Sequence, residues 1–545
     1  MAADTGRTAD RGRTADTGRA TDPRGLVMLA FDGPTVPDEL RARLAEAPAA
    51  GVTLFRHGNV RDPGQVRALT DELQAAAARP GAAVASFSPL LVAADQEGGQ
   101  LVALGDETTQ FAGAMALGAA GDRDLAERVG RATGLELRAM GVTVNYAPVC
   151  DLATNPGNPG LGIRSFGDDP VAAGALAAAY VRGLRSAGVA ATVKHFPGKG
   201  EMGVDTHHAL GAVASSRERF QDVELAPFRA TLADGADLVM TGHFATPGLT
   251  GDASLPATLS RAVLTDLLRG ELGFGGLVIS DALDMGALAQ DERQIVDVIA
   301  AVRAGVDLLL TTQDVVARHR IEAALVHAAA RGVLEPDALG RSAARLDALR
   351  RWLAGFDQPD LDVVACAEHR ALARALAERS IALIRDDAGL IPLRAAGAAE
   401  RRIAVFQPRP RDVTPADTTS TQGPGLAAAL RAHLPHVDEF VTNRPSDAEI
   451  AALRERAAGY DLLVVGTDSA PFDPEGAALA RALVAIGVPT VTVALRTPWD
   501  LPEYAAAATH VCSFGVLPPT LEALAAALVG RIPFRGRLPV AGPGA

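Results

Sequence analysis

The segment GGLVISDAL, residues 275–283, is typical of one strand of a parallel β-barrel. It begins with continuous apolar residues, as a strand buried on both faces requires, and it ends near a charged side chain, Asp281. Seven further segments begin in the same way, and several end in charged or imidazole side chains: LVMLAFDG (26–33), GVTLFRHGN (51–59), LLVAADQEGG (90–99), VTVNYAPVCDL (142–152), GVAATVKHFPG (188–198), ADLVMTGHF (236–244) and GVDLLLTTQ (305–313). Stretches with helical spacing and acidic starts separate them. These strand and helix units predict a (β/α)₈ TIM barrel over residues 25–356, with a doubly wound open sheet as the competing fold.

The rest of the chain divides into three parts. Three near-copies of a polar six-residue unit, TGRTAD, RGRTAD and TGRATD, predict a disordered low-complexity tail over residues 1–24. An acidic, proline-containing stretch predicts a linker over 357–363. Beyond it, the apolar runs IALIRDD, RIAVFQ, DLLVVGT and PTVTVALR look like buried parallel strands, so residues 364–545 are predicted to form a C-terminal α/β sandwich domain.

Composition narrows the possible partners and the compartment. A formal charge of −13 disfavours binding to phosphate backbones or anionic lipid, so we expect no nucleic-acid partner and no membrane partner. Three widely spaced cysteines predict neither a disulfide framework nor a zinc cluster. No secretory pattern or long apolar run is present, so the sequence predicts a cytoplasmic protein; its oligomeric state stays open.

Polar side chains gather where the predicted strands end, which is where the active site of a (β/α)₈ barrel lies. Five of the eleven histidines lie at or just after strand ends, and hydrogen bonding among them across the barrel mouth is the structural alternative to a catalytic role. The strand-end residues are Asp32, His57, Asp95, Gln96, Glu97, Asp151, Lys194, His195, His243 and Asp281.

Asp281 follows its strand directly, so its carboxylate is expected to project over the barrel axis. A buried acid that cations keep ionised can act as a nucleophile. The alternative is that it caps the next helix, a role that suits Asp284 better. Lys194 could serve as a charge partner of Asp281.

A second candidate group lies in the loop KHFPGKGEMGVDTHHAL, residues 194–210. Asp205 and His207 are separated by one residue, so in an extended loop their side chains lie on the same side and can touch. A carboxylate beside an imidazole fixes its tautomer and stabilises the protonated ring, as a general acid/base requires. Metal binding by His195, His207, His208 and Asp205 is the other interpretation; adjacent histidines rarely ligate one ion, so we expect no metal.

At these residues the sequence resembles glycoside hydrolase family 3, of the β-N-acetylglucosaminidase (β-hexosaminidase) type in its two-domain form. The matching motifs, in chain order, are DQEGG (95–99), NYAPVCDL (145–152), NPGLGIRSFG (158–167), KHFPGKG (194–200), DTHH (205–208), MTGHFATP (240–247), PATLS (256–260) and GFGGLVISDALDM (273–285).

The resemblance implies specific roles. It makes Asp281 the catalytic nucleophile and Asp205 with His207 an acid/base dyad, and it places Asp95, Arg164, Lys194 and His195 at the sugar. The implied reaction is retaining hydrolysis of terminal β-linked N-acetylglucosamine by double displacement, on muropeptides or small glycosides in cell-wall recycling, without a cofactor.

The chain also departs from the family pattern. Lys199, Glu201 and Thr206 replace the usual His, Asp and Ser, and Gln100 and Ala103 stand near positions where relatives carry arginine. These changes leave the dyad intact and bear on sugar preference.

Two further readings stay open. Phosphorolysis to a sugar 1-phosphate is possible because an imidazole, unlike a carboxylate, does not repel phosphate. The second alternative is a non-catalytic sugar-binding protein, although such a protein has no need to retain Asp281, Asp205 and His207.

Overall fold

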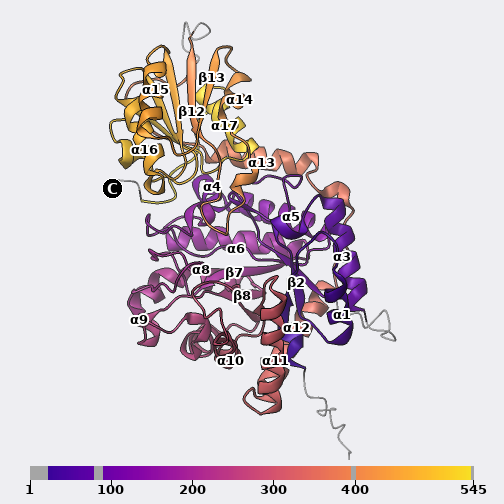
Figure 1. Ribbon diagram of the computed structural model, residues 1–545. Helices are drawn as coiled ribbons and strands as arrows, with labels where there is room; N and C mark the ends of the chain where they lie inside the picture. The colour runs from indigo at the N-terminus through magenta and orange to yellow at the C-terminus, as the bar shows by residue number, and fades with distance from the viewer. Residues whose placement is uncertain (1–21, 79–89, 394–400, 542–545) are drawn as a thin grey trace, which may run out of the picture.

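The computed structural model describes residues 22–78, 90–393 and 401–541, and Figure 1 shows a barrel with a smaller α/β unit above it. The predicted tail lies outside these ranges over residues 1–21. The last three residues assigned to the tail are instead ordered with the barrel: Asp22 caps a short 3₁₀ helix, Pro23–Leu26, and Pro23 and Arg24 form its first turn.

The predicted (β/α)₈ barrel is confirmed. Its parallel strands follow in the order β10, β1, β2, β3, β6, β7, β8 and β9, and Ile279 of β9 pairs in parallel with Leu308 beside β10, which closes the barrel. Each strand falls within a segment predicted from the sequence: β1 (Val27–Leu29), β2 (Gly51–Thr53), β3 (Leu91–Ala94), β6 (Val144–Asn145), β7 (Ala190–Phe196), β8 (Leu238–Thr241), β9 (Leu277–Ser280) and β10 (Leu309–Leu310).

Helices surround the strands, and aspartates begin several of them. Asp62, Asp122, Asp169 and Asp314 each accept a hydrogen bond from a backbone N–H of the first turn, which otherwise has no partner within the helix. The helical layer comprises α1 (Asp38–Glu46), α3 (Pro63–Ala77), α5 (Arg123–Ala139), α6 (Pro170–Ser186), α8 (Ala226–Ala233), the π-helical segment Ala262–Glu271, α10 (Gln294–Ala304), α11 (Val315–Ala330) and α12 (Pro336–Leu353), with short α2 (Arg56–Asn59), α4 (Ala114–Ala120), α7 (Arg217–Arg219) and α9 (Pro247–Thr250) in the loops.

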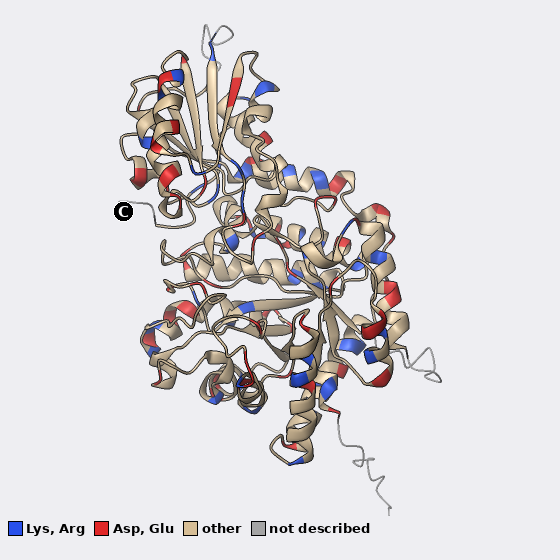
Figure 2. Ribbon diagram, viewed as in Figure 1, with Lys and Arg blue, Asp and Glu red and all other residues tan. Residues whose placement is uncertain are grey.

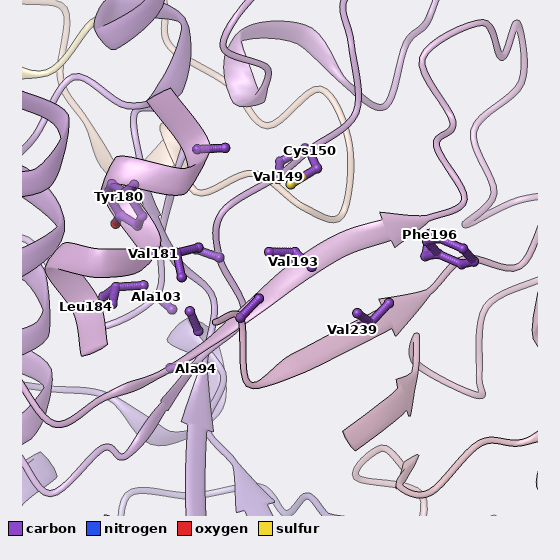
Figure 3. Close-up of a cluster of buried hydrophobic side chains, with 14 of the residues drawn as sticks. Ala94, Ala103, Val149, Cys150, Tyr180, Val181, Leu184, Val193, Phe196 and Val239 are labelled. Atoms are coloured by element: carbon purple, nitrogen blue, oxygen red, sulfur yellow. The ribbon is translucent and has the colours of Figure 1, made fainter. Parts of the chain in front are cut away.

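Successive side chains of each barrel strand point to opposite faces of the sheet, and this creates two apolar layers, one inside the barrel and one between the strands and the helices. Met28 belongs to the cluster that fills the barrel, whereas its neighbours Val27 and Leu29 belong to the cluster between strands and helices. Figure 3 shows part of the outer layer, with Val181 on α6 and Val193 on β7. Because both faces of each strand are buried, the sequence runs are continuously apolar.

The second unit is a six-stranded sheet between helices. Its strands are β11 (Ala382–Asp386), β12 (Ile403–Pro408), β13 (Val437–Thr442), β14 (Leu462–Thr467), β15 (Thr490–Ala494) and β16 (Thr509–Cys512), in the order β11, β16, β15, β14, β12, β13. One cluster joins the sheet to α14 (Leu426–Arg431) and α17 (Pro518–Leu528), and another joins it to α15 (Asp447–Ala457) and α16 (Pro474–Val484).

The prediction that all these strands are parallel is wrong for β11, which pairs antiparallel with β16 at the sheet edge. An apolar run records burial but not direction, and the half-buried Arg385 and Asp386 fit an edge strand.

The two units are joined at several points. Helix α13 (Ala367–Ser380) packs on α4 and α5 of the barrel. The start of the predicted linker is held on the barrel by Arg138, which donates to the carbonyl oxygen of Asp357 (3.4 Å) and to that of Phe356 just before the linker (2.5 Å). The end of the chain then returns to the barrel, where the Pro539 carbonyl accepts the Asp168 N–H (3.1 Å) and the Arg537 N–H reaches Ala119 (3.0 Å).

Charged residues lie mostly on the outer helices and loops, with both signs interspersed, and the barrel strands are largely uncharged (Figure 2). Among the described residues, no helix is both long enough and apolar enough to cross a bilayer. Lys194 and His195 on β7 are the exceptions in the strands, because both are charged or titratable and fully buried.

Candidate active site

A cavity of about 470 Å³ opens at the carboxyl ends of the barrel strands. A volume in this range suits a small ligand, and this face of a (β/α)₈ barrel is where active sites are built. The lining includes every residue to which the family resemblance assigns a role except Asp205, together with His57 and a loop of the second domain: His57, Asp95, Arg164, Lys194, His195, His207, Asp281 and residues 415–418.

Asp281 follows β9 on one side of this cavity. Its backbone N–H is held by the Thr241 carbonyl at 3.1 Å, and its carboxylate accepts the Ala282 N–H at 2.9 Å. The side chain is 15% exposed, so it is accessible from the cavity. Burial raises the pKa of Asp281, but the neighbouring His195, His243 and Lys199 outweigh burial and hold the pKa below its ordinary value. Asp281 is therefore ionised at neutral pH.

The loop after β7 brings Asp205 and His207 together. Asp205 Oδ1 lies 2.6 Å from His207 Nδ1 and also accepts the His207 backbone N–H at 3.0 Å. Although burial opposes ionisation, these hydrogen bonds lower the pKa of Asp205. An ionised carboxylate takes the proton on Nδ1, which leaves Nε2 of His207 as the ring atom for proton transfer.

The same loop is docked beside Asp281. The Gly286 N–H, on the connection after β9, donates to the His207 carbonyl at 3.1 Å. A Cβ atom at Gly286 would lie 2.8 Å from the His208 carbonyl oxygen and 3.1 Å from that of His207, so only glycine permits this approach. His207 and Asp281 consequently line one cavity.

Opposite Asp281, four charged side chains form a compact cluster. Lys194 Nζ contacts Asp95 (2.5 Å) and Glu97 (2.7 Å), and Arg164 binds Glu97 through two nitrogens (2.8 and 2.9 Å). Burial raises the pKa of Glu97, but the charges of Arg164 and Lys194 lower it by more, to about 2. Glu97 thus fixes both cations, while Asp95 reaches the cavity. The suggested pairing of Lys194 with Asp281 is wrong, because β7 directs Lys194 toward β3 instead.

Backbone geometry explains why glycines follow these acids. Gly98 and Gly99 have φ values of 80° and 62°, which other residues rarely adopt, and a Cβ on either would lie 3.0 Å from a carbonyl oxygen. They let the chain turn from β4 (Gln96–Gly98) into β5 (Leu101–Val102) next to Asp95.

His195 lies between the two sides of the cavity. Its Nδ1 is 2.7 Å from Asp151, and its Nε2 is 3.9 Å from Asp281. Burial, and then the charge of Lys199, lower the pKa of His195 well below its ordinary value, so the ring is neutral. With Nδ1–H donating to Asp151, Nε2 is available as an acceptor for a ligand hydroxyl.

The remaining strand-end residues play supporting parts. Asp151 also accepts the Lys199 N–H at 2.8 Å, which holds the loop that carries Asp205 and His207. His243 is buried next to Asp281, where it contacts Thr258 and the Ala282 carbonyl. The Gln96 side chain bonds to Leu104 and Thr108 in the loop after its hairpin, and Asp32 does not line the cavity. Among the described residues, no group of three or more His, Cys, Asp or Glu side chains is arranged to hold a metal ion.

Three features were not predicted as parts of the site. The sequence marks Glu97 only by its position at a strand end and Lys199 only by its departure from a family motif, and it does not mark the second-domain loop. The strand-end position of Glu97 was an available signal, whereas nothing local marks the loop.

This arrangement suits nucleophilic attack combined with proton transfer. An ionised carboxylate can attack an electrophilic carbon, and an imidazole held by a carboxylate can donate a proton to the departing oxygen. Charged and amide groups around the cavity can bind hydroxyls. Fold and cavity together have the features of a (β/α)₈-barrel glycoside hydrolase.

Comparison with known proteins identifies the family. The chain belongs to glycosyl hydrolase family 3, whose N-terminal domain model matches residues 24–349. Beta-hexosaminidase A of Pseudoalteromonas piscicida is 32% identical over 383 residues, which cover 66% of this chain and 63% of that protein. Beta-N-acetylglucosaminidase/beta-glucosidase of Cellulomonas fimi is 31% identical over 494 residues, 83% of each chain. The solved structure of a family 3 beta-N-acetylglucosaminidase from Paenibacillus sp. FPU-7 superimposes with a TM-score of 0.88 at 35% identity, covering 96% of this chain and 98% of that one.

Proposed function

We propose that this protein hydrolyses terminal β-linked N-acetylglucosamine with retention of configuration. The observation that carries the proposal is the presence in one cavity of an ionised Asp281 and of His207, whose ring is held by Asp205. The names of the relatives support the choice of sugar, because they include a β-hexosaminidase, a β-N-acetylglucosaminidase/β-glucosidase and a β-N-acetylglucosaminidase.

The reaction proceeds in two displacements. Asp281 attacks the anomeric carbon while Nε2–H of His207 gives its proton to the leaving oxygen, so the glycosidic bond breaks as a bond to Asp281 forms. Water then attacks the same carbon, His207 takes its proton, and the bond to Asp281 breaks. Asp205 remains ionised throughout and keeps Nε2 directed to the reacting oxygen.

The sugar lies between Asp281 and the charged cluster on the opposite side. Asp95 accepts hydrogen bonds from sugar hydroxyls, and Lys194 and Arg164 donate to them. Nε2 of His195 accepts from a hydroxyl near the anomeric carbon, because it lies 3.9 Å from Asp281. Glu97 holds Lys194 and Arg164 in place for this contact.

Chromogenic β-N-acetylglucosaminide provides the test. Asp281→Asn should lower kcat by about 10³-fold or more. Asp291→Asn, which changes an exposed carboxylate in the same connection, should keep full activity. Mass spectrometry of the enzyme trapped with a fluorinated substrate should place the sugar on Asp281. A label on another residue, or an active Asp281→Asn variant, would remove the proposal.

The natural substrate and compartment complete the proposal: muropeptides or small glycosides of cell-wall recycling, in the cytoplasm. Three free cysteines, two of them buried, are compatible with a reducing compartment. Cell fractionation and release of N-acetylglucosamine from purified muropeptides test the two parts separately.

A further inference from the structure

Two asparagine side chains from the connection between β6 and α6 hold the loop that leads to Asp205 and His207. We call residues 199–207 the acid/base loop. Four successive carbonyl oxygens of this loop each accept a hydrogen bond from one of the two amides. The contacts are Asn158 to Lys199 (2.9 Å) and Gly200 (3.1 Å), and Asn155 to Glu201 (3.2 Å) and Met202 (3.1 Å). Because a side-chain amide nitrogen carries two hydrogens, each asparagine uses its full donor capacity on this loop.

The orientation of Asn158 is fixed from both sides. Its Oδ1 accepts the Gly160 N–H at 3.1 Å, while its Nδ2 binds the acid/base loop, and the residue is 5% exposed. The two chain segments also approach closely at Gly200, where a Cβ atom would lie 2.0 Å from the Leu152 carbonyl oxygen, so only glycine fits. The Asn158 side chain therefore joins two segments that pack directly against each other.

The turn that Asn158 holds runs past the acid/base pair and also reaches the sugar-binding cluster. A Cβ atom at Gly160 would lie 3.4 Å from Asp205 Oδ1, the oxygen that contacts His207 Nδ1. The Gly160 carbonyl accepts a hydrogen bond from Arg164 Nη1 at 3.1 Å. An effect of the asparagines could thus act through His207 or through Arg164, and an experiment has to separate the two.

The acid/base loop is held before and after its functional residues. The asparagines bind residues 199–202, and the Gly286 N–H binds the His207 carbonyl at 3.1 Å. Between these points Gly203 and Val204 are exposed, so their side chains contribute little packing. The position of the His207 ring consequently depends on both attachments.

We propose that Asn155 and Asn158 are positioning residues, which keep His207 Nε2 at the leaving oxygen during the first displacement. This inference rests on the proposed function. Proton transfer requires the donor within roughly 2.6–3.2 Å of the oxygen, and a displacement of about 1 Å can cost about 10²-fold in rate. Release of residues 199–202 would move His207 away from the leaving oxygen, while Asp281 on its own strand would stay in place.

Two variants test the inference. Asn158→Ala and Asn155→Ala each remove the donors to two of the four carbonyls. Asn443→Ala, which makes the same change at an exposed position of the second domain, is the matched control. The readout is kcat/KM, which reports the first displacement, for a dinitrophenyl and a methyl β-N-acetylglucosaminide. Dinitrophenolate departs without a proton, whereas methoxide needs the proton of His207. The melting temperature of each variant shows whether it is folded.

Asn158→Ala should lower kcat/KM about 10- to 100-fold on the methyl glycoside and less than about threefold on the dinitrophenyl glycoside. Asn155→Ala should act in the same direction but less, because Asn155 is only half-buried, and it decides the question alone if Asn158→Ala does not fold. Asn443→Ala should match the wild type.

Equal losses on both substrates would mean that the asparagines act through Arg164 and the sugar, or through the fold, and would overturn the inference. An unchanged kcat/KM on the methyl glycoside in a folded variant would overturn it as well. Failure of the proposed function is distinct, because the wild type itself would then release no N-acetylglucosamine from either substrate.

Discussion

Glutamine at position 97 would keep the size of the side chain but remove the negative charge that Lys194 and Arg164 share. Glu97 is buried and lies within 2.9 Å of both cations. Its loss would leave the charges of Lys194 and Arg164 balanced mainly by Asp95. We expect Glu97→Gln to destabilise the fold and to displace the groups proposed to bind the sugar.

The shift in the pKa of Glu97 gives the size of the expected loss of folding free energy. A reduction from the ordinary value of 4.5 to about 2 corresponds to about 3 kcal/mol of folding free energy. Removing one partner of a buried ion pair typically costs about 3–5 kcal/mol, which agrees. Because the folded pKa is lowered, this contribution is fully present above pH 4.5 and is lost as pH falls toward 2. The variant has no carboxyl group at this position to titrate. The difference in unfolding free energy between wild type and variant should therefore be smaller by about 1 kcal/mol at pH 4.

Urea unfolding from pH 4 to pH 7.5 measures this difference in unfolding free energy. The fluorescence of the two tryptophans, Trp352 in the barrel and Trp499 in the second domain, reports the transition. Glu107→Gln, an exposed acid in the loop that follows the same hairpin, is the control and should be within 0.5 kcal/mol of wild type, roughly the spread of surface substitutions. A Glu97→Gln variant as stable as wild type at pH 7, or a gap that widens on acidification, would refute the electrostatic reasoning.

Three further outcomes are expected. Asp205→Asn should lower kcat about 10²- to 10⁴-fold on poor leaving groups and little on dinitrophenyl glycosides, which depart without a proton; equal losses would contradict the acid/base assignment. Gly286→Ala should lower kcat with little change in melting temperature, because its Cβ would push the carbonyls of His207 and His208 away; unchanged kcat would show that the docking is dispensable. Adding phosphate to the assay should yield no sugar 1-phosphate if water is the acceptor, and product analysis by mass spectrometry decides between the two.

Much of the fold follows from local patterns. Continuous apolar runs locate all the barrel strands, because a strand covered on both faces cannot tolerate polar residues along most of its length. Capping aspartates such as Asp122 and Asp169 mark where helices begin. Strand direction is not encoded locally, which is why the apolar run of β11 predicts a parallel strand. Its orientation depends on where α13 delivers the chain to the sheet edge.

The residues of the candidate site also fall into two groups, those that local sequence marks and those that only long-range contacts bring together. Asp281 could be found because it ends an apolar run, and Asp205 with His207 because residues two apart share a side of an extended loop. Glu97 meets Arg164 across 67 residues of sequence, and Gln100 meets Ala416 across 316. Such pairs arise from closure of the barrel and docking of the second domain. No pattern within either segment encodes them.

The second domain is attached to the barrel at two places, because residues near its C-terminal end, Arg537 and Pro539, also bind the barrel. A body tethered once can swing about its tether, but one secured at both ends of its chain cannot do so without first detaching an end. We therefore expect ligands to enter and leave through an opening of constant size, without a hinge motion between the two domains. We also expect the two domains to unfold on heating in one cooperative transition.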